Sequence, residues 1–154
     1  MRTSPVYGGA MEPRVSLITL GVADLERAVA FYENVLGWKV AQRPPGVAFF
    51  DLGGLVLALW GHADLAQDMG LARPAASGGY EGFSLAHNLR SIEEVDALFA
   101  HLKRHGATIV KPPQKAPWGG YTGYFADPDG HTWEVAYNPH WTVRPDGRIA
   151  LSPP

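Results

Sequence analysis

The chain lacks cysteine, and neither sign of charge is in large excess. Without cysteine there is no thiolate nucleophile, no Cys-based zinc site and no iron–sulfur cluster. Thirteen basic and fifteen acidic side chains leave a formal net charge of −2. A nucleic-acid surface needs clustered positive charge, so this balance disfavours one. Sites built from histidine, carboxylate or apolar groups stay open.

Long apolar runs are also missing. No run reaches the roughly 18 residues that cross a bilayer, and residues 1–13 contain no apolar stretch of signal-peptide length. We therefore expect a cytoplasmic protein without a membrane partner. The length of 154 residues predicts one domain over 14–141, between an N-terminal tail (1–13) and a C-terminal tail (142–154).

Eighteen glycines and thirteen prolines are spread along the chain in short clusters, which indicates turns between many short strands. The first half begins with a β-branched run at 15–20. Asp24 follows as a helix N-cap, apolar residues recur at helical spacing, and Gly37 ends the helix. The three strands predicted after this helix are 38–42, 47–52 and 55–60.

The second half repeats this order. A strand over 82–88 is followed by a capping box from Ser91 to Glu94, and Gly106 ends the helix that the box begins. The three strands predicted next are 107–111, 121–126 and 132–137, the last two joined by an Asp-Pro-Asp-Gly turn. The sequence thus predicts two βαβββ modules, about 14–62 and about 80–138. Residues 63–79 between them are a linker or a lid.

Tandem βαβββ modules resemble the vicinal oxygen chelate superfamily, which includes glyoxalase I, bleomycin-resistance proteins and extradiol dioxygenases. Two segments carry the resemblance: Val22-Ala23-Asp24-Leu25 with the AFYENVLG run after it, and the YFADPDGHTWEV run over 124–135. The resemblance implies an α+β fold with curved, mixed eight-stranded half-barrel sheets and helices outside. It also implies a homodimer, with modules of one chain or of two chains around each cavity.

Enzymes of that superfamily hold a divalent metal with His, Glu or Gln, His, and Glu. The resemblance places those positions on Leu17, Ala58, Phe83 and Glu134, and a shift of one residue exchanges Phe83 for Ser84. One carboxylate among apolar residues is too few ligands, because catalytic sites normally use about three. We therefore expect no metal and no other cofactor.

The histidines elsewhere in the sequence are weak candidates to replace the missing metal ligands. His62 and His87 share the strand parity of the cavity positions but lie four residues further on, roughly 13 Å away, so we interpret them as rim residues. His101 and His105 have the spacing of a helical metal pair, yet basic neighbours favour a solvated helix end. His131 is expected to be exposed in its hairpin turn.

Aromatic residues surround the predicted cavity and suit a planar ligand. Trp60, Trp118 and Tyr121 are placed at the cavity, whereas Trp133 alternates with Glu134 and so packs against a helix. Glu134 is the candidate catalytic residue, either as a general base or as an acceptor that orients a ligand. A purely structural role for its carboxylate stays open.

Our leading hypothesis is a metal-independent protein that binds a small, aromatic organic molecule, as in the bleomycin-resistance branch. The predicted ligand-binding residues are Leu17, Ala58, Trp60, Phe83, His87, Trp118, Tyr121 and Glu134. The alternative is a lyase or isomerase of glyoxalase type, acting on a carbonyl compound through Glu134. A dioxygenase is the weakest hypothesis, since its iron site is missing. An interaction module without a ligand is a further class.

Overall fold

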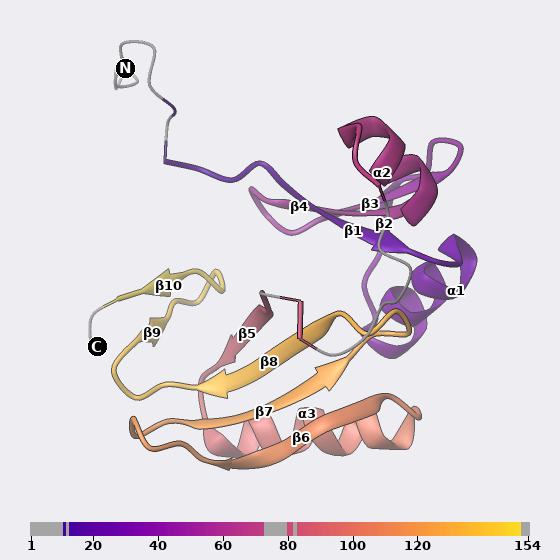
Figure 1. Cartoon of the computed structure of the whole chain (residues 1–154). Helices are drawn as coiled ribbons and strands as arrows, with labels where there is room; N and C mark the ends of the chain where they lie inside the picture. The colour runs from indigo at the N-terminus through magenta and orange to yellow at the C-terminus, as the bar shows by residue number, and fades with distance from the viewer. Residues whose placement is uncertain (1–10, 12, 73–79, 82, 152–154) are drawn as a thin grey trace.

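The computed structural model describes residues 11, 13–72, 80, 81 and 83–151, and it shows two modules of the expected order (Figure 1). The first contains β1 (Leu17–Val22), α1 (Leu25–Ala30), the π-helix η1 (Phe31–Val35), β2 (Val40–Gln42), β3 (Val47–Asp51) and β4 (Val56–Gly61). The second contains β5 (Leu85–Leu89), α3 (Ile92–Arg104), β6 (Thr108–Lys115), β7 (Tyr121–Ala126) and β8 (Thr132–Tyr137). The predicted α+β class with two βαβββ modules is confirmed.

Helices α1 and α3 each begin at an N-cap side chain that the sequence predicted. The Asp24 carboxylate accepts a hydrogen bond from the Arg27 amide at 3.1 Å, and the Ser91 hydroxyl accepts one from the Glu94 amide at 3.1 Å. The Glu94 side chain reaches back to the amide of Arg90, one residue before the cap. These bonds satisfy backbone N–H groups that the first helical turn leaves unpaired.

The eight module strands form two separate four-stranded sheets. Sheet A has the order β1-β4-β3-β2 and sheet B the order β5-β8-β7-β6. In each sheet the first strand of the module runs parallel to the fourth, and the other pairs are antiparallel. Strands β1 and β5 are therefore edge strands, each with one side of its backbone unpaired among the described residues.

Segments outside the modules also contain regular secondary structure. The linker predicted for 63–79 begins with α2 (His62–Met69), and its residues 73–79 lie outside the described part, as does most of the predicted N-terminal tail. The region expected as a C-terminal tail contains a hairpin of β9 (Thr142–Val143) and β10 (Ile149–Ala150). Among the described residues, no helix is long and apolar enough to cross a membrane.

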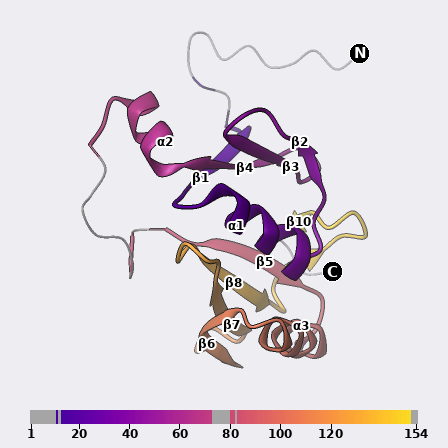
Figure 2. The ribbon, with the colours of Figure 1, turned by 90° about the vertical axis from the view of Figure 1, so that its right-hand side faces the viewer.

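One core joins the modules. We call the sheet surface that packs on the helices the helix face, and the opposite surface the open face. The helix face of sheet A contributes Phe50, and that of sheet B contributes Phe125 and Trp133. Tyr32 of η1 contacts both sheets, with ring centroids 5.7 Å from Phe50 and 6.3 Å from Trp133. Figure 2 shows α1 between the two sheets, so the open faces point away from the shared core.

A buried hydrogen-bond chain crosses the same junction. The Tyr32 hydroxyl donates to Asp127 Oδ2 at 2.9 Å and accepts from Trp133 Nε1 at 3.2 Å. Asp127 Oδ1 accepts from the backbone amides of Asp129 and His131. Burial raises the pKa of Asp127, and burial together with the Asp127 charge raises the pKa of Tyr32. The chain fixes the β7–β8 turn on the first module.

Two histidines reinforce this junction, against expectation. His131 is half-buried and donates from Nε2 to the Gly21 carbonyl at 2.6 Å. His101 is half-buried and donates from Nε2 to the Val35 carbonyl at 2.8 Å. The predictions of an exposed turn and a solvated helix end were wrong for these two side chains, because each finds a backbone acceptor in the other module.

We predict that Tyr32→Phe lowers the free energy of unfolding by about 1–3 kcal/mol, because Asp127 and Trp133 each lose a buried partner. Denaturant unfolding followed by circular dichroism measures the change. Tyr80→Phe is the matched control, since Tyr80 is 91% exposed, and it should leave stability within about 0.5 kcal/mol. Equal stability of Tyr32→Phe and wild type would contradict the role of the hydroxyl.

Candidate functional site

The open face of sheet A carries Leu17 and Ala58, the first two of the four positions at which superfamily enzymes hold a metal. Leu17 lies opposite Val56, and Thr19 lies opposite Ala58, in the parallel pairing of β1 with β4. Leu17 is 48% exposed, whereas Ala58 is 1% exposed between Thr19 and Phe49. Leu17 is thus accessible on this face, and Ala58 forms part of its floor.

Comparison of the two modules corrects the third of the four superfamily metal-ligand positions. In sheet B, Ala86 lies opposite Glu134, as Thr19 lies opposite Ala58 in sheet A. Leu17 precedes Thr19 by two residues, and Ser84 precedes Ala86 by two. Ser84 therefore corresponds to Leu17, and the assignment of this position to Phe83 was wrong by one residue.

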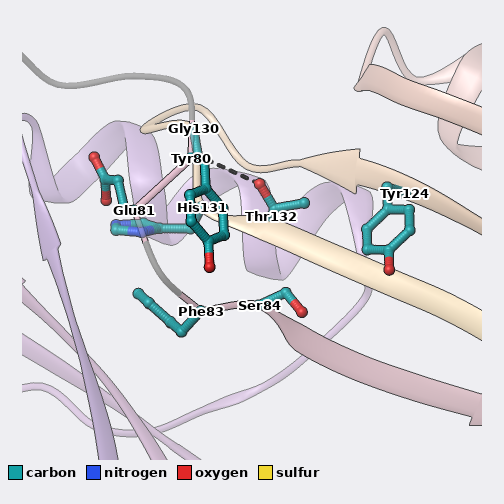
Figure 3. Close-up of a pocket in the computed structure, with 8 residues that line it drawn as sticks. All are labelled: Tyr80, Glu81, Phe83, Ser84, Tyr124, Gly130, His131 and Thr132. Carbon is teal, nitrogen blue, oxygen red and sulfur yellow. Dashed lines mark hydrogen bonds between the residues drawn. The ribbon is translucent and has the colours of Figure 1, made fainter.

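Each module has a cavity of its own. A cavity of about 520 Å³ on sheet A is lined by Leu17, Phe49 and Val56 together with polar residues of β2 and β3. A cavity of about 430 Å³ beside sheet B is lined by Tyr80, Glu81, Phe83, Ser84, Tyr124, Gly130, His131 and Thr132. Figure 3 shows the second, with Glu81 at one end and Tyr124 at the other. Both cavities mix apolar surface with a few polar groups, as small-molecule sites do.

The carboxylate of Glu134 has a fixed partner. Tyr124 lies opposite Glu134 in the β7–β8 pairing, and its hydroxyl donates to Glu134 Oε2 at 2.8 Å. This hydrogen bond, with burial and the carboxylate charge, raises the pKa of Tyr124 above its ordinary value of 10.0. Our sequence reasoning missed Tyr124. The hairpin turn contained the signal, because counting outward from Ala126 and Thr132 pairs Tyr124 with Glu134.

The open face of sheet B also carries a buried hydroxyl, on Thr122, two residues before Tyr124 on β7. Thr122 is 6% exposed, and its Oγ1 has no hydrogen-bond partner among the described residues. Thr122 alternates with Gly123 and so shares the face of Tyr124. The open face of sheet B therefore presents a carboxylate, a phenol and an unpaired hydroxyl in neighbouring positions.

The family is shown by direct comparison. Residues 14–135 match the family model described as Glyoxalase/Bleomycin resistance protein/Dioxygenase superfamily. The chain belongs to this superfamily. The matched range contains the first module and the second as far as the middle of β8, and it ends one residue after Glu134.

Three relatives illustrate the range of the superfamily. A metallothiol transferase FosB from Lysinibacillus sphaericus is 32% identical over 120 residues, which cover 78% of this chain and 79% of that protein. A glyoxalase-related enzyme from Fulvimarina pelagi has a solved structure with a TM-score of 0.82 and 39% identity, covering 92% of this chain and 99% of that one. A lactoylglutathione lyase from Agrobacterium tumefaciens has a TM-score of 0.63 and 25% identity, covering 82% and 95%.

The superfamily positions do not fit a metal in this chain. They carry Leu17, Ala58, Ser84 and Glu134, a set with one carboxylate and one hydroxyl. A catalytic divalent metal normally takes about three side-chain ligands. Nowhere in the part of the chain that the structure describes do three His, Asp or Glu side chains gather as a metal site.

Several predicted ligand-binding residues lie elsewhere. His87 pairs with Val135, and Tyr121 pairs with Tyr137, so both lie on the helix face of sheet B, and their placement at the cavity was wrong. The Tyr121 hydroxyl instead donates to Asp96 of α3 at 2.5 Å.

The two predicted tryptophans are near the open faces but outside both cavities. Trp60 is on the open face of sheet A, opposite Val47, and contributes to a separate surface hollow with Asp64 and Asp68 of α2. Trp118 is 46% exposed and lies against the backbone of Gly120. Trp133 is buried on the helix face, as its alternation with Glu134 predicted.

We predict that Glu134→Gln lowers the pKa of Tyr124 toward 10.0, because removing the negative charge makes the phenolate easier to form. NMR titration of tyrosine labelled at Cζ measures the pKa. Asp96→Asn is the matched control: it should lower the pKa of Tyr121, which its hydrogen bond to Asp96 raises, and leave Tyr124 unchanged. A Tyr124 pKa that is the same in wild type and Glu134→Gln would contradict the contact.

Proposed function

We propose that this superfamily member binds a small, aromatic organic molecule on its open faces without a catalytic metal. One observation carries the proposal. Of the four superfamily positions only Glu134 can bind a metal ion strongly, and its carboxylate already accepts a hydrogen bond from Tyr124. A carboxylate held by a phenol suits a neutral or cationic ligand with a hydrogen-bond donor.

The lining of the two cavities supports an apolar, planar ligand. Leu17, Phe49 and Val56 supply aliphatic and aromatic surface on sheet A. Phe83 and Tyr124 supply aromatic surface beside sheet B, with Phe83 52% exposed. Burial of apolar area contributes about 25 cal/mol per Å², so such walls bind by area while Glu134 orients the ligand.

We also propose a homodimer in which each site combines sheet A of one copy with sheet B of the other. The two helix faces share one core, so the open faces of a single chain point away from each other. Each cavity is consequently bounded by one sheet only. The unpaired edges of β1 and β5 leave room for a second copy to continue each sheet.

The alternative is a lyase or isomerase of glyoxalase type that acts on a carbonyl compound. Glu134 Oε1 has no hydrogen-bond partner among the described residues, so it is free to take a proton from a carbon next to a carbonyl. The Tyr124 hydroxyl lies beside it as a hydrogen-bond donor. The similarity to a lactoylglutathione lyase favours this class of reaction over ring cleavage by a dioxygenase.

The test is to identify what purifies with the protein. We expect native mass spectrometry to find an organic ligand, and elemental analysis to find no stoichiometric Ni, Zn, Fe or Mn. Glu134→Gln should weaken rebinding of that ligand about fivefold, the effect of one hydrogen bond of about 1 kcal/mol. Glu93→Gln, an exposed change on α3, is the control.

The same experiment separates the two proposals. If the ligand is turned over and Glu134→Gln slows turnover by about 10²–10⁴, Glu134 is a general base and the protein is an enzyme. A stoichiometric metal whose removal by chelator abolishes binding would overturn the metal-independent site.

We predict that Leu17→Arg shifts the protein toward monomer, because it places a charge on an apolar face that we assign to the dimer interface. Sedimentation velocity measures the shift. Val110→Arg on β6 is the matched control: Val110 is 55% exposed, close to the 48% of Leu17, and lies on the far edge strand of sheet B. A wild-type protein that is monomeric at micromolar concentration would contradict the proposal.

A further inference from the structure

A second kind of cavity lies on the helix face of sheet B, at the junction of the modules. Its volume is about 120 Å³. Its walls include Trp38, which follows η1, Leu98 of α3, and Phe125 and Trp133 of sheet B, and His87 of β5 contributes a polar group. All of these residues belong to the described part of the chain.

This cavity is separate from the site around Glu134. His87 lies opposite Val135 in the parallel β5–β8 pairing, and both line the cavity. Glu134 is the neighbour of Val135 along β8, so its side chain points to the other side of the sheet. Sheet B itself divides the two places, and a molecule in one does not touch the other.

Two stacked rings form one aromatic wall of the cavity. The rings of Phe125 and Trp133 are nearly parallel, at 5° and a centroid separation of 6.2 Å. Trp38 stands edge-on to Trp133, at 83° and 5.6 Å. Aromatic rings favour offset stacks and edge-to-face contacts at these separations, so a further ring can be added to the set. Leu98 contributes an aliphatic wall from α3.

His87 supplies the polar group. Neither imidazole nitrogen has a hydrogen-bond partner among the described residues, and the ring lies at the exposed side of the cavity on an edge strand. Burial lowers the pKa of His87 below its ordinary value, and the Glu94 charge opposes this to a smaller extent. The lowered pKa favours the neutral ring, in which one nitrogen donates and the other accepts. The other histidine of the cavity, His101, already donates to Val35.

We infer that this cavity binds a monocyclic phenol, with its ring against the aromatic walls and its hydroxyl on the His87 imidazole. The volume of about 120 Å³ is of the same order as the roughly 150 Å³ of an apolar protein cavity that binds benzene. A hydroxyl both donates and accepts, and so matches either nitrogen of a neutral imidazole. The inference does not depend on the proposed function, since it uses the opposite side of the sheet.

The test is isothermal titration calorimetry of the full chain with phenol and with toluene, which has a similar ring but no hydroxyl. Wild type should bind both saturably. His87→Leu should weaken phenol binding about fivefold, the effect of one hydrogen bond of about 1 kcal/mol, and leave toluene binding unchanged. Leu98→Phe, which fills the cavity from α3, should abolish binding of both. Glu93→Gln, an exposed change on α3, is the control that should bind phenol as wild type does.

Two further measurements keep the result decisive. Thermal unfolding shows whether each variant folds, and NMR shifts of the indole N–H signals of Trp38 and Trp133 locate phenol even if Leu98→Phe is unstable. Loss of phenol binding in Glu134→Gln would assign phenol to the open face instead. Absence of saturable phenol binding to wild type, or equal phenol affinity of wild type and His87→Leu, would overturn the inference.

Discussion

The hydroxyl of Tyr32 joins the two modules, and the rest of the structure depends on that junction. It donates to Asp127 and accepts from Trp133, so an atom of η1 holds both the turn and the second strand of the β7–β8 hairpin. A buried polar chain of this kind is favourable only when every member has its partners, which permits one relative placement of the modules. The Asp129 carboxylate extends the junction by accepting from the Ala23 amide at 2.8 Å.

Because the helix faces of both sheets pack into this junction, the open faces point away from the shared core. Leu17 stays accessible on one face, and Glu134 on the other is bounded by its own sheet alone. In the proposed dimer, a second copy would supply the further surface that encloses a ligand.

The sequence allowed much of this fold to be predicted, because its local signals are physical ones. Strands β7 and β8 begin and end where the turn and the alternation placed them, and both helix caps form the predicted bonds. It was harder to predict which side chains of β5 lie on which face of sheet B. A shift of one residue reverses the face of every side chain, and the parallel β5–β8 register depends on tertiary packing, so Phe83 and His87 were misplaced. The π-helix η1 had no signal in the apolar spacing.

The pairing of Glu134 with Tyr124 also decides what the open face of sheet B can recognise. A divalent cation would neutralise the carboxylate and present open coordination positions to two oxygens of a ligand. A phenol supplies one neutral donor, leaves the negative charge in place and leaves Oε1 free to accept. In the proposed function, the same glutamate would therefore recognise a donor or a transferable proton on the ligand, and not a pair of neighbouring oxygens. The apolar walls of the two cavities would then select the ligand by shape and buried area.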